Sequence, residues 1–402
     1  MAITQNETLA RDVASNARWT GVGSSEACDS FEAGAEAATH ACAKSDPKLF
    51  VVFAGHRHDH AAILDGVCSV APDGSEIIGC TTGGEIGIGG PTDGGVVVMA
   101  IGGDGISVST RFAEAHGDLR KAGETVGMAV DDIEDRGHSV LLLLSDGLAG
   151  DQQEVVRGAY ATVGAQVPLV GGCAGDGLEM TSTVLFCANG EGKSIGGDSV
   201  IGAAISSVAP LGVGVYHGWQ QVGDPVLITH SEGNVVHTID EEPALDRYLR
   251  LHGAAADLAD DPDAFTHFAA THPLGIVRRG GDEVRFITTA DPVARTITSI
   301  ASVPIGAMAW AMTGTSDSVL DATDIACSAA IEQLDGPAIG VLAFDCVARR
   351  GVMGESGIQD EVERIKKQVG APMVGFYTYG EFARLKGASG FHNQTLVTLA
   401  IG

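Results

Sequence analysis

The segment GHRHDHAAIL, residues 55–64, contains three histidines and an aspartate within five consecutive positions. Imidazole and carboxylate groups are zinc ligands, and a catalytic zinc needs about three of them together with a bound water. The spacing differs from the H-x-H-x-D-H pattern of zinc hydrolases, because Asp59 follows His58 directly. The alternative is that the segment begins a helix, whose first free amides Asp59 caps. We favour the helix cap and predict no metal site, since no further ligand can be identified downstream.

Glycine-rich turns that end in an acidic residue occur three times. They are corner 1, GCTTGGE at 79–85, corner 2, GGCAGD at 171–176, and corner 3, GFYTYGE at 375–381. Glycine lets a backbone approach a ligand closely, and free amides in such turns bind carboxylate or phosphate. The carboxylates of Glu85, Asp176 and Glu381 can then hold a ligand ammonium group, so we predict them as ligand-binding residues for an amino acid. The alternative, which stays open, is that the turns are structural and their carboxylates accept backbone hydrogen bonds.

The segment around corner 3 is the richest in aromatic and polar groups. Its candidate residues are Tyr377, Tyr379, Glu381, His392 and Asn393. Together they combine an apolar wall with a few hydrogen-bonding groups, which is typical of small-molecule pockets. The competing interpretation is a packing motif in the core.

Two arginines follow a buried strand in FDCVARR, residues 344–350. Loops after strands carry function in α/β folds, and arginine is the natural partner of a ligand carboxylate. We therefore predict that Arg349 and Arg350 bind the ligand. The alternative is internal pairing, for example between Arg350 and Glu381.

Catalysis by a cysteine is a further chemical option. Cys80 and Cys173 stand in corners 1 and 2, where nearby amides can activate a thiolate. Corner 3 has Phe376 at the place of Cys80, so the repeated turn does not require a thiol. The chain also lacks a phosphate-binding G-x-x-x-x-G-K-[ST] loop. We predict a binding protein and not an enzyme, and keep a cysteine-dependent enzyme as the alternative.

Each of the three corners ends one copy of a repeated sequence unit. The copies begin with KLFVVFAG, HSVLLLLSDG and AIGVLAFDC. Each has the pattern of a buried strand, a loop, an amphipathic helix and a short strand that leads into the corner. This alternation predicts an α/β fold, and the apolar strands after corners 1 and 3 predict antiparallel neighbours. We expect internally repeated strand–helix–strand units with mixed parallel and antiparallel sheets, in two interlocked domains.

A domain boundary is predicted near Asp240. The preceding residues have the pattern of strands and turns, whereas EEPALDRYLR begins a helix with Pro243 in its first turn. The predicted domains are residues 1–240 and 241–402. No low-complexity linker separates them, so we expect them to pack together.

Composition excludes several classes of partner. The 402-residue chain has 52 acidic and 24 basic residues, a formal charge of −28, which repels nucleic acid and anionic membranes. No apolar run approaches the roughly 20 residues that span a bilayer, and the N-terminus lacks the apolar region of a secretory signal. We expect a soluble cytoplasmic protein whose eight dispersed cysteines are free thiols.

A series of short motifs runs along the chain. They are GCTTGGEI at 79–86, PLVGGCAGD at 168–176, HGW at 217–219, SEGN at 231–234, PALDRY at 243–248, HPLG at 272–275, FDCVARR at 344–350, GFYTYGEFAR at 375–384 and FHNQTLV at 391–397. The set resembles the FIST family, a sensory module of bacterial and archaeal signal transduction with N-terminal and C-terminal FIST domains. The resemblance covers nearly the whole chain from about Gly21 onward.

The resemblance implies an intracellular sensor of a small molecule, with amino acids or related metabolites as proposed ligands. Some FIST proteins bind haem, respond to nitric oxide and regulate a histidine kinase or a cyclic-di-GMP enzyme. His217, His272 and His392 lie in family motifs and are the candidates for a haem axial ligand. No C-x-x-C-H motif is present, which excludes covalent c-type haem.

We therefore expect an amino-acid-like ligand in a pocket at the domain junction. No kinase, cyclase or DNA-binding segment is recognisable in the sequence, so a separate partner protein would receive the signal. A haem-based nitric oxide sensor is the alternative within sensing. The oligomeric state stays open.

Overall fold

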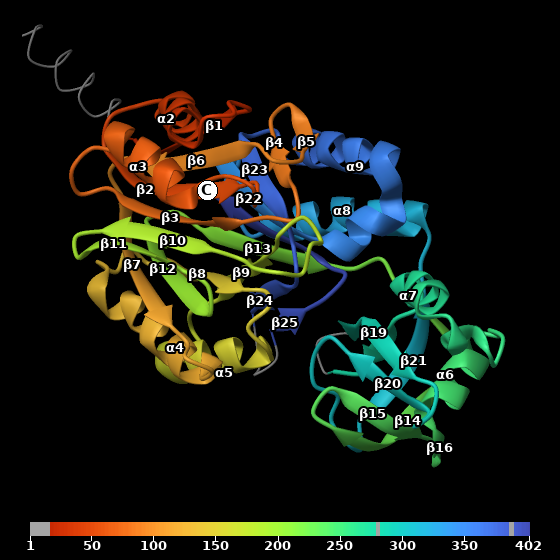
Figure 1. The fold of residues 1–402 in the computed structure, drawn as a ribbon. Helices are drawn as coiled ribbons and strands as arrows, with labels where there is room; N and C mark the ends of the chain where they lie inside the picture. The colour runs from red at the N-terminus through yellow and green to blue at the C-terminus, as the bar shows by residue number, and fades with distance from the viewer. Residues whose placement is uncertain (1–16, 279–281, 386–389) are drawn as a thin grey trace, which may run out of the picture.

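The computed structural model describes residues 17–278, 282–385 and 390–402. A larger body contains both ends of the described chain, and a smaller lobe, drawn green to cyan in Figure 1, lies beside it. The body consists of three units with the same order of elements. The lobe is inserted into the third unit, between strand β13 and helix α8.

The first unit runs from residue 19 to 102. Its elements are β1 (Trp19–Ser25), α2 (Ser30–Ala41), β2 (Pro47–Ala54), α3 (His60–Val70), β3 (Glu76–Thr81), β4 (Glu85–Gly87), β5 (Gly90–Thr92) and β6 (Val96–Gly102). The second unit repeats this order. It contains β7 (Ile106–Glu114), α4 (Leu119–Gly127), the 3₁₀ helix η1 (Met128–Asp132), β8 (His138–Asp146), α5 (Gln153–Val163), β9 (Leu169–Ala174), β10 (Leu185–Asn189), β11 (Gly192–Gly196) and β12 (Ser199–Ser207).

The third unit encloses the inserted lobe. Its own elements are β13 (Leu211–Tyr216), α8 (Ser316–Ile331), β22 (Gly340–Cys346), α9 (Val347–Val369), β23 (Met373–Thr378), β24 (Glu381–Arg384), β25 (Phe391–His392) and β26 (Leu396–Ile401). The lobe contains β14 (Gln220–Glu232), β15 (Val235–Ile239), β16 (Glu242–Pro243), α6 (Ala244–Leu251), η2 (Leu258–Asp260), α7 (Pro262–Ala270), β17 (Leu274–Ile276), β18 (Glu283–Arg285), β19 (Ile287–Asp291), β20 (Thr296–Ser299) and β21 (Met308–Thr313). Asp240, where the sequence predicts a domain boundary, follows β15 inside this lobe.

Each unit completes its sheet with a hairpin from another unit. The central parallel pairs are β2–β3, β8–β9 and β22–β23. The hairpin β10–β11 of the second unit pairs with β3, β24–β25 of the third pairs with β9, and β4–β5 of the first pairs with β23. The exchange runs in a closed circle through all three units. It confirms the expected mixed α/β fold with repeated, interlocked parts.

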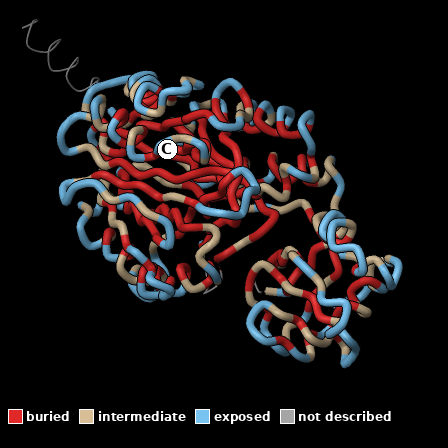
Figure 2. The backbone as a smooth tube through the Cα atoms, in the orientation of Figure 1, coloured by how far each residue is buried: buried red, intermediate tan, exposed pale blue. Residues whose placement is uncertain are grey.

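The core of the body lies between the three sheets. Apolar side chains of all three sheets form one buried cluster, which includes Val51, Leu142 and Leu342 on the central strands. The outer face of each sheet is covered by a helix pair, α2–α3, α4–α5 or α8–α9. Figure 2 shows these strands as a continuous buried interior, with a separate and smaller core in the lobe. Among the described residues, no helix has the length and apolarity needed to cross a membrane.

One glycine occupies the same place in each parallel pair. Gly79, Gly171 and Gly375 lie in register with residues of the neighbouring strand, and a Cβ atom on each would approach that residue's carbonyl oxygen to 2.7, 1.9 and 2.1 Å. The φ angle of Gly171 is +144°, which side-chain-bearing residues rarely adopt. The repeated glycine is therefore a requirement of close strand packing next to each corner.

We expect Gly171→Ala to destabilise the fold by about 3 kcal/mol, because it combines an unfavourable φ with a collision against the Leu143 carbonyl. Gly190→Ala is the control, since a Cβ there meets no atom within 4 Å, and it should change stability by less than about 0.5 kcal/mol. Denaturant unfolding measures both. Equal stability of the two variants would contradict the packing argument.

Candidate functional site

The three corners meet at the centre of the body and hydrogen-bond to one another. The Gly83 amide donates to the Tyr377 carbonyl and the Tyr377 amide donates to the Gly84 carbonyl, each at 2.8 Å. The Cys173 amide donates to Gly380 at 2.8 Å, and the Gly175 amide donates to Thr81 of corner 1 at 3.1 Å. Corners that are more than 85 positions apart in sequence therefore form one connected backbone network.

The acidic residues of corners 1 and 3 accept equivalent hydrogen bonds within the protein. Glu85 accepts hydrogen bonds from the Thr82 hydroxyl and, at 2.9 Å, from the Gly95 amide. Glu381 accepts from the Thr378 hydroxyl and, at 3.2 Å, from the Thr395 amide. Burial raises the pKa of Glu85 to about 7 and that of Glu381 to about 8. The structural role that the sequence left open is thus observed at both corners.

Asp176 of corner 2 organises a loop instead. It accepts hydrogen bonds from three successive backbone amides, those of Met180, Thr181 and Ser182, and from the Tyr379 hydroxyl at 2.5 Å. Burial opposes ionisation of Asp176, but these hydrogen bonds outweigh it and lower its pKa to about 2. The carboxylate therefore stays ionised at neutral pH and fixes the loop after corner 2.

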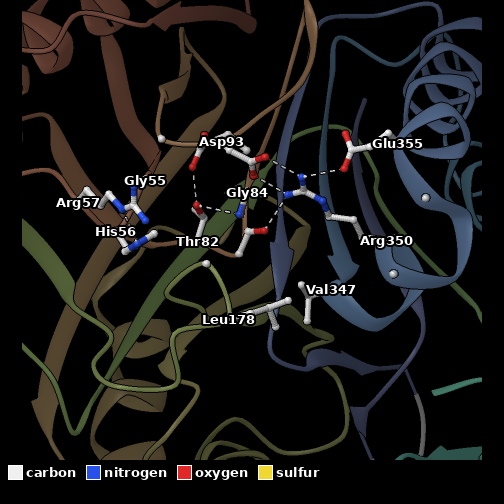
Figure 3. Close-up of a pocket in the computed structure, with 16 residues that line it drawn as sticks. Gly55, His56, Arg57, Thr82, Gly84, Asp93, Leu178, Val347, Arg350 and Glu355 are labelled. Atoms are coloured by element: carbon white, nitrogen blue, oxygen red, sulfur yellow. Dashed lines mark hydrogen bonds and ion pairs between the residues drawn. The ribbon is translucent and has the colours of Figure 1, made fainter. Parts of the chain in front are cut away.

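A cavity of about 560 Å³ opens between the three units, next to corner 1 (Figure 3). The first unit contributes the loop after β2, corner 1 and the loop after β5, the second contributes the loop after corner 2, and the third contributes the first turns of α9. The lining residues are Gly55, His56, Arg57, Thr82, Gly83, Gly84, Glu85, Asp93, Gly94, Gly177, Leu178, Val347, Arg350, Gly351, Gly354 and Glu355. This volume suits a small metabolite.

Arg350 forms the charged wall on the third unit. Its guanidinium makes a bidentate ion pair with Asp93, at 2.6 and 2.7 Å, and donates to the Gly83 carbonyl at 3.0 Å. The hydrogen bonds from Arg350 lower the pKa of Asp93. The guanidinium also lies 5.0 Å from the ring centre of Tyr377, so the aromatic ring supports the arginine from behind.

His56 and Arg57 form the opposite wall. His56 Nε2 lies 3.1 Å from Glu179 Oε1, and Arg57 donates to the same oxygen at 3.2 Å. Arg57 also donates to His56 Nε2 at 3.3 Å, and its side chain is 81% exposed at the rim. Figure 3 shows these two side chains on one side of the opening and Arg350 on the other, with Asp93 between them.

Leu178 and Val347 provide an apolar edge of the cavity. Leu178 is 62% exposed and adopts a positive φ of 69°, which is unfavourable for a side chain of its size. Its amide donates to the Tyr379 hydroxyl at 2.7 Å. Tyr379 and Asp176 therefore act on the cavity indirectly, because they hold the loop that presents Leu178.

Two consecutive arginines at the start of helix α9 face different surroundings. Arg349 lies in the core, and Arg350 lines the cavity. Arg350 lines the cavity together with Gly354, whose φ of 66° interrupts the helix. Arg349 is fully buried and uses its nitrogens entirely within the protein. Its acceptors are Asp345, Glu361, Thr323, Val319 and His217. Burial raises the pKa of Asp345, whereas the adjacent Arg349 guanidinium lowers it.

The histidine-rich segment begins helix α3, as predicted. Asp59 is the N-cap and accepts hydrogen bonds from the amides of Ala61 and Ala62 at 3.0 and 3.2 Å. His58 contacts Ser30 and the Gly94 carbonyl, whereas His60 is buried and contacts the Gly55 carbonyl. Among the described residues, no group of three or more histidine, cysteine or acidic side chains is placed to hold a metal ion.

The three histidines considered as haem ligands lie in protein contacts. His217 Nδ1 accepts from the Trp219 amide, His272 Nδ1 contacts the Phe268 carbonyl, and His392 Nε2 contacts the Ala383 carbonyl. None of them lines the cavity described above. This arrangement does not fit an axial ligand facing a haem-sized space there, and haem binding stays a prediction without support from this cavity.

Of the predicted ligand-binding residues, Glu85 and Arg350 line the cavity. Tyr377 supports Arg350, and Asp176 with Tyr379 supports Leu178. Arg349, Glu381, His392 and Asn393 lie elsewhere, and the buried side chain of Asn393 has no hydrogen-bond partner among the described residues. The sequence did not indicate Arg57, Thr82, Asp93, Leu178, Val347 and Glu355 as ligand-binding residues, and His56 was considered only as a metal ligand. The glycines on both sides of Asp93 could have indicated that this loop approaches a ligand closely.

The thiols in corners 1 and 2 are inaccessible. Cys80 and Cys173 are fully buried, and burial raises the pKa of both thiols well above the ordinary value. The sequence GKSIG at 192–196 has the G-x-S-x-G spacing of a nucleophile elbow, but it forms strand β11 of a hairpin. Neither arrangement supplies an activated nucleophile.

The raised pKa of Glu85 predicts a pH-dependent stability. Because its pKa rises from 4.5 to about 7 on folding, its contribution is fully present below pH 4.5 and is lost as the pH rises through about 7, by at most about 3 kcal/mol. We expect the free energy of unfolding of the wild type, relative to Glu85→Gln, to fall between pH 5 and pH 8. Urea unfolding at both pH values measures this, and Glu363→Gln on the exposed side of α9 is the control. A constant difference would contradict the shift.

Comparison with known proteins places the chain in one family. The FIST N domain model matches residues 48–242 and the FIST C domain model matches residues 244–384. An uncharacterized protein of Mycobacterium tuberculosis, found in two strains, is 24% identical over 387 residues, which cover 93% of this chain and 97% of the relative. A solved structure of cyanuric acid hydrolase aligns over 96% of this chain and 100% of its own, with 10% identity and a TM-score of 0.31, and this low similarity supports no further conclusion. The two family models together cover most of the described body and lobe, and the chain belongs to the FIST family, whose domains are associated with sensory and signal-transduction roles.

Proposed function

We propose that the cavity next to corner 1 binds a small amino-acid-like metabolite, and that the protein is the ligand-binding part of a signalling system. The observation that carries this proposal is the arrangement of charges around the cavity. Arg350 faces the His56–Arg57 wall, and Asp93 lies between them. A zwitterionic ligand carries a negative charge that complements the arginines and a positive charge that complements the carboxylate.

The ligand carboxylate has two guanidinium groups available. Arg350 is held by its neighbours and is 16% exposed, whereas Arg57 lies at the rim with 81% exposure. A carboxylate that reaches Arg350 competes with Asp93 for a bidentate pair, which is the strong geometry for arginine. Arg57 and His56 can then cover the same carboxylate from the other wall.

The ligand ammonium group has acidic partners at the same opening. Asp93 and Glu355 are 68% and 89% exposed beside Arg350, and Glu85 lies beneath them in the lining. Two arginines against these carboxylates make a lining of mixed sign, which disfavours a polyanion or a polycation. The ligand side chain would pack on Leu178 and Val347.

Ligand binding at this position would act on the arrangement of the units. The cavity is lined by loops of all three units, so a ligand that contacts both walls favours one relative placement of them. A partner that distinguishes the two states then receives the signal. A histidine kinase or a cyclic-di-GMP enzyme is the kind of partner that the family resemblance suggests.

A panel of amino acids and related acids, screened by thermal shift, tests the ligand class, because a ligand that binds only the folded state raises its melting temperature. For a compound that stabilises the wild type, we expect Arg350→Met and Asp93→Asn each to weaken binding about tenfold or more in calorimetry. The matched controls are Arg364→Met and Asp321→Asn, which form an ion pair of 3.0 Å outside the cavity. Unchanged affinity in Arg350→Met would refute its role, and absence of any stabilising compound would refute the ligand class.

The visible absorption spectrum after addition of haemin distinguishes a haem-based sensor from the proposed sensor of an amino-acid-like metabolite. A specific Soret band at one haem per chain, shifting with nitric oxide, would favour the gas sensor over the proposal made here.

The reactivity of individual thiols distinguishes a cysteine-dependent enzyme from the proposed ligand-binding protein. We expect Cys28, which is exposed, to be alkylated rapidly in the native protein at neutral pH. Cys80 and Cys173 should react only after unfolding, because burial keeps them protonated and inaccessible. Peptide mapping by mass spectrometry measures each site. Rapid native alkylation of Cys80 or Cys173 would restore the cysteine-dependent enzyme.

A further inference from the structure

A second cavity of about 390 Å³ lies where the inserted lobe meets helix α5 of the body. The lobe contributes Arg278, Glu283 and Arg285 around β18, and α5 contributes Arg157. The two sides are connected directly, because the Ser302 hydroxyl of the lobe donates to Asp151 of the body at 2.6 Å. The cavity therefore lies between the lobe and the body of Figure 1, which are also joined by a hydrogen bond from Gln394 to the Ala270 carbonyl at 2.7 Å.

The lining is strongly basic for this chain. Three of its 24 basic residues line one small cavity together with a single carboxylate, that of Glu283, although acidic residues exceed basic ones by 52 to 24. Asp151 and Glu154 lie outside the lining, where Asp151 holds Ser302 and Glu154 pairs with Arg157. The groups that face a ligand thus carry a local positive charge in an acidic protein, which favours an anion.

The arginines are only partly used by the protein. Arg278 Nε and Arg285 Nη2 converge on the same oxygen, Glu283 Oε2, at 3.0 and 2.9 Å. Among the described residues, the terminal nitrogens of Arg278 have no hydrogen-bond partner, and Arg157 pairs only with Glu154. These guanidinium groups retain donors for a ligand.

Glu283 provides the second, independent observation. It is 3% exposed, yet its Oε1 atom has no hydrogen-bond partner among the described residues. A buried carboxylate oxygen without a partner is costly, because it has lost its hydration. An uncharged donor on a ligand, such as a hydroxyl group, would satisfy this oxygen while the anionic part of the ligand contacts the arginines.

We propose that this cavity is a binding site for an organic phosphate that carries hydroxyl groups. The phosphate dianion pairs with Arg157 and Arg278, which approach from the body and from the lobe, and a ligand hydroxyl donates to Glu283 Oε1. Phosphate fits better than a monocarboxylate because guanidinium groups bind its several oxygens in a bidentate manner and its charge matches the excess of the lining. The bound ligand would link the lobe to the body. This site is separate from the cavity next to corner 1 and does not rest on its proposed function.

Calorimetry on the full chain with glycerol 3-phosphate, inorganic phosphate and glycerol tests the site. We expect glycerol 3-phosphate to bind, inorganic phosphate to bind more weakly because it cannot place an alkyl hydroxyl on Glu283, and glycerol alone not to bind. Arg157→Ala and Arg278→Ala should each weaken glycerol 3-phosphate binding about tenfold or more. Both residues are partly exposed, at 48% and 31%, so the variants should fold.

Two variants serve as controls. Arg364→Ala removes an arginine that lines neither cavity, and Arg350→Met alters only the cavity next to corner 1, so both should retain the wild-type affinity for glycerol 3-phosphate. The proposal is overturned if none of the phosphates binds, if Arg157→Ala and Arg278→Ala bind as tightly as the wild type, or if Arg364→Ala loses the same affinity, which would indicate attraction by general charge. Loss of amino-acid binding in Arg350→Met with intact phosphate binding keeps the two sites distinguishable.

Discussion

The exchange of hairpins between units is the constraint on which the rest of the structure depends. Strands β3, β9 and β23 would each expose an unpaired edge within their own unit, and an exposed edge favours aggregation. A hairpin from a different unit pairs with each of these edges. Because the exchange is circular, no unit can complete its sheet alone, and the three units must form one body around a common core.

The exchange of hairpins determines the backbone conformation and the hydrogen bonds of the three corners. Each corner connects a strand of one sheet to a hairpin that leaves for another, so the chain must turn sharply where two units meet. Glycine at 84, with a φ of +122°, makes such a turn and leaves room for Arg350. The threonine–glutamate pairs of corners 1 and 3 satisfy backbone amides that the sheets leave unpaired. The cavity next to corner 1 lies at this junction, and its lining therefore comes from all three units.

The two cavities differ in the charge that they present. The cavity next to corner 1 combines cations and carboxylates, as a zwitterionic ligand requires. The cavity beside the lobe is lined by three arginines and one glutamate, as a phosphate requires. The first cavity lies between the three units of the body and the second lies between the body and the lobe, and such junctions are a common position for ligand sites. Ligands at such positions change the relative stability of domain arrangements, which is the physical basis of a sensor.

The sequence by itself determined the repeat, the mixed α/β class, the Asp59 helix cap and the family, because these depend on local periodicity, turn residues and short motifs. It also predicted Arg350 and Glu85, which stand in or beside recognisable turns and line the cavity next to corner 1. Only the tertiary structure decided which neighbour of the pair Arg349 and Arg350 enters the core, since one helix position separates complete burial from the cavity wall. It alone decided the exchange of hairpins and brought Asp93, Leu178 and Arg350 together, because contacts between residues 85 or more positions apart leave no local pattern in the chain.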